Sequence, residues 1–108
     1  MSPTLKKLRN RLEYRCDGSD DYVRCIRAIA RTRDVDAVRI LVSLLDSTGP
    51  IAKAAMTALV GFGEAAVPEM QRCVESDDAD VIAHGEEVLE RVELRSARLA
   101  REGVRVAA

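Results

Sequence analysis

The stretch ALVGFGEAAVPEMQRCVESDDADVIAHGEEVL, from Ala58 to Leu89, decides the fold. It contains the end of one apolar stripe, a Gly-Phe-Gly break, a second stripe, an acidic turn and a third stripe. In the third stripe, Val81, Gly85, Val88 and Leu89, with Val92 just beyond the stretch, recur at offsets that gather on one face of a helix. The stretch therefore predicts three amphipathic helical segments separated by two turns.

The same arrangement recurs along the chain with a period of thirty residues. Small or apolar residues align at this period in two columns, which are Cys25, Ala55 and Gly85, and Ile29, Leu59 and Leu89. Periods of about 20–50 residues are typical of architectures that stack one helical unit on the next. We expect the short side chains of the first column to let successive second helices approach one another closely.

Turn and capping residues divide the chain into six expected helices, at residues 3–16, 20–31, 34–46, 50–61, 65–75 and 79–102. Pro50 suits a first helical position, and the glycines at 61 and 63 suit the end of a helix. The sequence predicts an all-α fold, a short right-handed α-solenoid of three two-helix repeats. These repeats are expected at residues 3–31, 34–61 and 65–102. Together they form a single domain, 1–103, and a flexible tail is expected at 104–108.

Composition agrees with packed helices in one domain. Hydrophobic residues make up 47% of the 108-residue chain and charged residues 32%, a balance that excludes a disordered polar tract. No apolar run is expected to span a bilayer, and the basic residues 1–10 lack the apolar segment of a secretory signal. We expect a cytoplasmic protein that does not enter a membrane.

Cysteine and histidine usage argues against reactive chemistry. Cys16, Cys25 and Cys73 lack CxxC spacing and lie on predicted apolar faces, so we expect reduced, buried thiols. His84 is the single histidine, which leaves a structural zinc site short of ligands. The sequence therefore predicts no catalytic residue, no metal site and no cofactor.

The chain also resembles a known repeat family. The residues that carry the likeness are Ala58-Leu59, Gly61, Gly63, Val67-Pro68, Asp77-Asp78 and Val81 to Leu89. They follow the pattern of the short HEAT-like repeat of phycobilisome-lyase-type proteins, which the chain resembles over residues 20–92. The resemblance implies a binding scaffold, because HEAT-like units mostly serve that purpose.

Two enzyme classes are related to that repeat. HEAT-like di-iron hydroxylases use His-Glu pairs on successive helices, whereas here His84 is followed by Gly85. Bilin lyases of the related type have more repeats, and a lyase subunit would show a tetrapyrrole absorbance on purification. We therefore expect no enzymatic activity. A subunit of a larger lyase remains an alternative to this expectation.

Charge is unevenly placed along the chain. Residues 1–39 hold ten Lys/Arg against six Asp/Glu, a net charge of +4, and residues 40–95 hold four against eleven, a net charge of −7. If the second helices line the concave side of the solenoid, the residues opposite their core stripes project into a groove. The predicted partner-binding residues are Val23, Arg27, Lys53, Thr57, Val60, Glu87 and Glu90, with Ala83 beside the last two. Such a groove would change from basic to acidic and so orient a bound helix or peptide.

These observations favour a non-enzymatic adaptor or scaffold that binds a protein partner in this groove or along its last helix. Self-association is a further expectation, because both ends of a short solenoid expose apolar surface. The alternative is a small nucleic-acid-associated protein that uses basic residues of the first two helices, Lys6, Lys7, Arg9, Arg11, Arg15, Arg24, Arg27 and Arg31. Only three aromatic residues are present to stack on bases, which weighs against nucleic acid.

Overall fold

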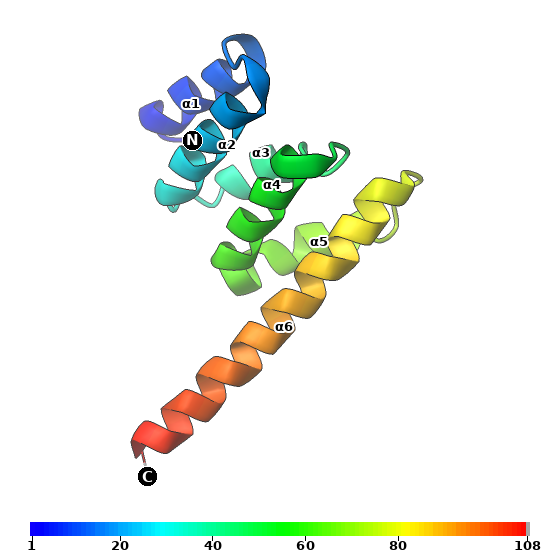
Figure 1. Cartoon of the computed structure of the whole chain (residues 1–108). Coiled ribbons are helices and arrows are strands. Elements are labelled where there is room, and N and C mark those ends of the chain that lie inside the picture. Colours follow the sequence, from blue (N-terminus) through cyan, green and yellow to red (C-terminus); the bar gives the residue numbers. More distant parts are fainter. Residues whose placement is uncertain (108) are drawn as a thin grey trace.

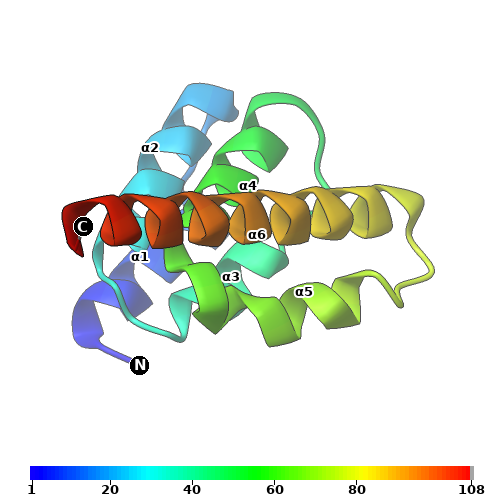
Figure 2. The same ribbon diagram turned by 90° about the horizontal axis from the view of Figure 1, so that it is seen from below.

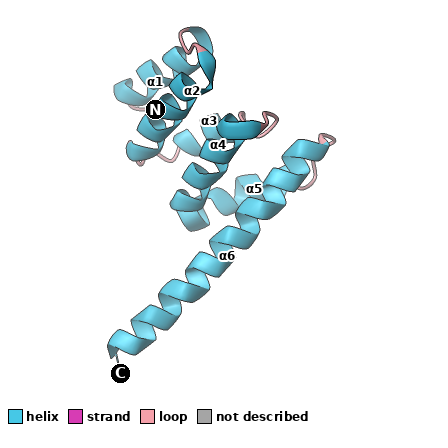
Figure 3. Ribbon diagram, in the orientation of Figure 1, coloured by secondary structure: helices cyan, strands magenta, loops and turns pink. Residues whose placement is uncertain are grey.

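The computed structural model describes residues 1–107, and the side chains of residues 1–102. Every regular element in this range is a helix, and Figure 3 shows helices joined by loops throughout it. The predicted all-α class is therefore confirmed.

The helices form three successive pairs. The elements are α1 (Pro3–Tyr14), α2 (Gly18–Arg31), α3 (Ala37–Val42), α4 (Gly49–Phe62), the 3-10 turn η1 (Gly63–Ala66), α5 (Val67–Cys73) and α6 (Ala79–Ala107). Within the pairs, α1 packs on α2, α3 on α4 and α5 on α6, and between pairs α2 packs on α4, α4 on α6 and α3 on α5. Figure 1 shows the pairs following one another from α1 to α6, and Figure 2 shows α6 running across the others in the view from below.

Two of the helices, α1 and α6, begin at a capping side chain. Ser2 precedes α1, and its Oγ accepts the Leu5 backbone N–H at 3.2 Å. Asp78 precedes α6, and its Oδ1 accepts the backbone N–H groups of Asp80 at 2.9 Å and of Val81 at 3.3 Å. Each cap satisfies donors that the first turn of a helix leaves without an intrahelical partner.

The third helix is shorter than the expected 34–46, because side chains and turns compete with it at both ends. The Asp36 N–H donates to Asp34 Oδ1 at 3.0 Å, an Asx-type turn that holds the chain outside the helix. At the other end, the Leu45 N–H donates to the Val42 carbonyl at 3.0 Å, so that tight turns replace the α-helix after Val42. The α-helical part is therefore Ala37–Val42.

The last helix is longer than expected. The sequence predicted an end near residue 102 and a flexible tail at 104–108, whereas α6 continues through Ala107. Ala108 lies outside the described residues. An internal glycine costs about 1 kcal/mol relative to alanine, and at Gly103 this is not enough to end the helix.

The core lies between the helices of the three pairs, and among its fully buried large side chains are Leu5, Ile26, Ile29, Leu41, Leu45, Leu59, Met70 and Val88. Two of the short residues predicted to separate successive second helices, Gly85 and Cys25, instead face the first helix of their own pair. A Cβ added at Gly85 of α6 would stand 2.8 Å from the Cys73 Cβ of α5. Likewise, the Cys25 thiol of α2 donates to the Leu8 carbonyl of α1 at 3.3 Å. Gly85 therefore allows the close packing of α6 on α5.

One apolar segment corrects the expectation that no run approaches the length needed to span a bilayer. Gly49–Cys73 has 25 residues, and an 18-residue window within it has a mean hydropathy of 1.2, which length and composition alone allow for a crossing. In the structure it is not one α-helix, because Gly63 turns the chain with φ 61° and η1 separates α4 from α5. Ala55 and Leu59 of this segment are fully buried in the core of the protein.

Candidate docking groove

A groove runs between the neighbouring helices α2 and α4. Its first part has a volume of about 480 Å³ and is lined by Val23, Ile26, Arg27, Ala30, Arg31, Pro50, Lys53, Ala54, Thr57 and Ala58. A second part of about 320 Å³ shares four of these residues and extends to Arg33, Gly61 and Phe62 at the ends of the two helices. The two parts therefore form one continuous groove along α2 and α4.

The groove combines an apolar floor with a cationic rim. Its floor is made of alanines, Val23 and Ile26, the last of which is fully buried. Its charged lining side chains are Arg27, Arg31, Arg33 and Lys53, and among the described residues that line it there is no carboxylate. The Arg33 guanidinium also donates to the Gly61 carbonyl at 3.5 Å, which holds it beside the end of α4. The groove therefore attracts negative charge and offers apolar contact in the same place.

Four of the predicted partner-binding residues lie together in this groove: Val23, Arg27, Lys53 and Thr57. Sequence reasoning did not assign Arg31 and Arg33 to this groove, although it named Arg31 among the basic residues of the nucleic-acid alternative. The signal was available for Arg31, which is one helical turn after Arg27.

Val60 does not line the groove, and its predicted exposure is corrected by the structure. Its side chain is 9% exposed and belongs to the core cluster. The cause is α6, which packs against α4, and the Arg95 guanidinium of α6 donates to the Val60 carbonyl at 3.3 Å. A partner cannot reach Val60 without displacing α6.

Glu87 and Glu90 also lie outside the groove. Both side chains are exposed on α6, on the side away from the buried Val88 and Val92. The predicted change from basic to acidic along a single groove is therefore divided between two places, a basic groove on α2 and α4 and an acidic surface on α6.

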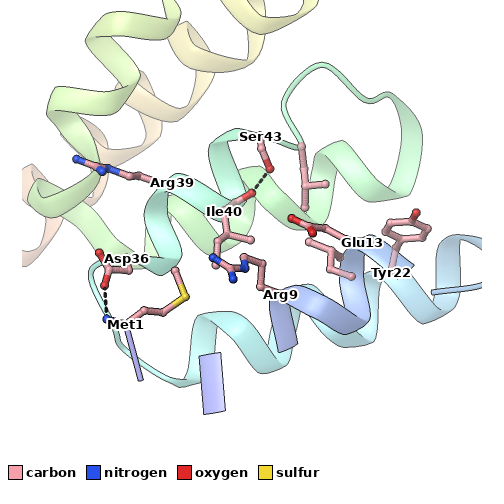
Figure 4. A pocket seen from close by; sticks show the side chains of 10 residues that line it. Met1, Arg9, Glu13, Tyr22, Asp36, Arg39, Ile40 and Ser43 are labelled. Carbon is pink, nitrogen blue, oxygen red and sulfur yellow. Dashed lines mark hydrogen bonds and ion pairs between the residues drawn. The ribbon is translucent and has the colours of Figure 1, made fainter. Parts of the chain in front are cut away.

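A second recess, shown in Figure 4, lies between α1, the start of α2 and α3 and has a volume of about 550 Å³. Its lining side chains carry both signs of charge, with Arg9 and Arg39 opposed by Glu13 and Asp36. The Met1 amino group forms an ion pair with Asp36 Oδ2 at 3.2 Å at one side of it. Because charges of both signs meet there, this recess selects a ligand by charge less strongly than the groove does.

A third recess, of about 570 Å³, lies on α1 and is lined by Lys7, Asn10, Arg11 and Arg15. Arg11 already forms an ion pair with Asp21 of α2 at 3.0 Å. All four lining side chains are polar, so this surface offers charge without an apolar floor.

Two of the three thiols, those of Cys25 and Cys73, are buried as expected, whereas Cys16 is partly exposed. Burial raises the pKa of the Cys25 thiol to about 11, and the neighbouring Cys16 raises it further in the same direction. Burial also raises the pKa of the Cys73 thiol, with a smaller contribution from the charge of Glu69. A thiol is nucleophilic as the thiolate, so a raised pKa keeps both groups unreactive near neutral pH.

His84 has a structural contact. Its Nδ1 lies 2.7 Å from the Leu45 carbonyl oxygen, and because a carbonyl only accepts, Nδ1–H is the donor. The bond ties α6 to the turn that follows α3. Within the described part of the chain, no group of three or more His, Cys, Asp or Glu side chains is placed to hold a metal ion.

Comparison of the chain with protein-family models, with curated proteins and with solved structures finds no match. The HEAT-like resemblance and the count of three repeats therefore stay predictions.

Proposed function

We propose that this chain is a non-enzymatic interaction module, a cytoplasmic adaptor or scaffold that holds a partner protein in the groove between α2 and α4. We further propose that its three helix pairs are the repeats of a short right-handed α-solenoid of HEAT-like type. The order of helix contacts supports this architecture, since each helix packs on its pair mate and each second helix packs on the next second helix. The three free cysteines agree with a reducing compartment.

The observation that carries the function is the lining of the groove. An apolar floor between two rigid helices is the usual receptor for one face of an amphipathic helix or extended segment. The rim carries Arg27, Arg31, Arg33 and Lys53, so the fitting partner segment has acidic residues flanking its apolar anchors. In this proposal the apolar contact supplies most of the affinity and the rim selects and orients the partner.

The proposal is tested with a labelled synthetic helix of about 20 residues that carries leucines on one face and glutamates beside them. Fluorescence anisotropy measures its binding to the wild type and to Arg27→Glu and Lys53→Glu variants. Each reversal places a carboxylate beside the partner's glutamates, so we expect each to weaken binding by about tenfold or more. A second peptide, with lysines in place of the glutamates, should bind far more weakly to the wild type.

Arg24→Glu is the matched control. Arg24 is exposed on the same helix but does not line the groove, so the same change in charge should leave peptide affinity within about twofold. Equal losses in the Arg24, Arg27 and Lys53 variants would show a general charge effect and would refute the groove as the binding site.

Nucleic-acid binding is the second candidate, and the all-polar recess of Lys7, Asn10, Arg11 and Arg15 on α1 favours it. A single-stranded DNA of about 20 nucleotides serves as the probe. Phosphate binding falls steeply with salt, because each neutralised phosphate releases counterions, whereas binding to an apolar floor changes much less. DNA binding that is lost between about 50 and 200 mM salt and on Lys7→Glu, but kept on Lys53→Glu, would favour this candidate.

A further inference from the structure

The outer face of α6 carries an exposed stripe that the groove does not involve. At its centre is Leu94, whose side chain is 61% exposed. Glu87 and Glu90 precede it and Arg98 and Arg101 follow it, all with exposed side chains. The five residues gather on one side of the helix, because offsets of three, four and seven residues return to nearly the same direction.

Along this stripe, charges of opposite sign lie at equal distances on either side of Leu94. Glu90 lies four residues before Leu94 and Arg98 four residues after it, and Glu87 and Arg101 lie seven residues before and after. Along the helix axis these offsets amount to about 6 Å and about 10 Å. Turned end for end, the stripe therefore presents an arginine wherever the original presents a glutamate.

We propose that two copies of this chain pair antiparallel along this face of α6, with Leu94 of one copy against Leu94 of the other. In this arrangement Glu90 of each copy faces the Arg98 position of its partner, and Glu87 faces the Arg101 position. The pairing is isologous, so it closes at two copies and does not extend into a filament. A parallel pairing would set like charges against each other and is disfavoured.

The fold leaves this face free for a second copy. The opposite side of α6 packs on the body through Val88 and Val92, which are buried, and the Arg95 guanidinium on that side reaches the Val60 carbonyl. Figure 1 shows the second half of α6 extending past the other helices, so the arginine-bearing half is not covered by the body.

The composition of the stripe predicts a weak dimer that depends on salt. Leu94 is its one large apolar side chain, and its ion pairs are exposed to solvent, where each contributes little and is screened by salt. Arg98 already lies 3.3 Å from Glu102 of its own helix, and its five guanidinium N–H groups allow a second carboxylate partner. We expect self-association at low salt that is largely lost at about 0.5 M salt.

The first experiment is sedimentation of the purified chain over a range of concentrations up to about 1 mM. Leu94→Asp should abolish dimerisation at low salt, because it buries an unpaired charge at the centre of the interface. Leu99→Asp is the matched control: Leu99 is 55% exposed on the same helix, but it follows Val92 by seven residues and so faces the body side. Circular dichroism of both variants establishes that α6 is still helical.

The second experiment exchanges the charges. The double variant Glu87→Arg/Glu90→Arg should be monomeric, and so should Arg98→Glu/Arg101→Glu, since each places like charges across the interface. A mixture of the two double variants should form a heterodimer, because every facing pair is then of opposite sign. A monomeric wild type at the highest concentration, equal effects of the two leucine variants, or a mixture that remains monomeric would each overturn the proposal. None of these results bears on peptide binding by the groove, which is a separate surface.

Discussion

Gly85 lies where α6 packs closely against α5. Its missing side chain is a requirement of packing, because an added Cβ would stand 2.8 Å from the Cys73 Cβ, an atom that no side-chain rotation can move away. Its equivalent in the second pair, Ala55, is fully buried as well. The absence of a side chain at Gly85 therefore allows α5 and α6 to pack closely.

Gly85→Ala should destabilise the protein, although alanine is the better helix former by about 1 kcal/mol. Overpacking of a close contact costs about 1–3 kcal/mol, which exceeds that gain. Adding Cys73→Ala should not restore stability, since the clashing Cβ remains. Gly61→Ala is the control, because a Cβ at Gly61 would meet nothing within 4 Å. Urea unfolding measures all of these variants, and a stabilised Gly85→Ala protein would contradict the contact.

The cysteines should differ in their reactivity towards iodoacetamide in the native state. Cys16 is partly exposed, whereas Cys25 and Cys73 are buried and burial raises the pKa of both thiols. At about pH 8 we expect labelling of Cys16 within minutes and of the other two only on unfolding. Mass spectrometry of the labelled peptides measures the order, and prompt native labelling of Cys73 would show that the interface between α5 and α6 opens.

At the scale of the element, the helix starts were more predictable than the helix lengths. Caps such as Ser2 and Asp78 are local, because a side chain bonds to backbone groups two or three residues away. Helix α3 is short because the Asp36 N–H donates to the Asp34 side chain in a turn. This turn competes with the helix, and the pattern of apolar residues does not reveal it.

Asp78→Ala should destabilise the start of α6. The variant loses the carboxylate that accepts the N–H groups of Asp80 and Val81, at a cost of about 1 kcal/mol, or about 5 °C in Tm for a domain of this size. Asp77→Ala is the comparison, because it removes the same charge while Asp77 makes no such bond among the described residues. Thermal unfolding followed by circular dichroism distinguishes them, and equal losses would make the effect one of charge alone.

At the scale of the whole molecule, two carboxylates fasten the first helix to its neighbours. Backbone N–H donation by Asp36 and then by Ser2 lowers the pKa of the Asp34 carboxyl, and this joins the start of α1 to the turn before α3. Backbone N–H donation by Asp17 lowers the pKa of the Asp21 carboxyl, as does its bond to Arg11 of α1. Both groups are charged in the folded protein at neutral pH.

Stability should therefore fall in acid. A carboxyl whose pKa is lower in the folded than in the unfolded chain stabilises the fold above the unfolded pKa, about 3.9 for Asp, and loses this contribution as pH falls through the folded pKa. We expect the urea midpoint of the wild type to drop between about pH 6 and pH 3, and Asp34→Asn to show a smaller drop. If the midpoint of Asp34→Asn falls as far as that of the wild type, protonation of Asp34 is not linked to folding.

The sequence by itself determined the all-α class, the turns between the helices and four of the residues that line the groove, because these follow from which residue types recur on one face of a helix. Arg27 and Lys53 could be placed on one surface for that reason. Tertiary structure alone decided that α6 covers Val60, that Gly85 faces Cys73, and that Glu87 and Glu90 lie apart from the groove. Periodicity records that a face is covered, but the neighbour that covers it depends on where helices distant in the chain come to lie.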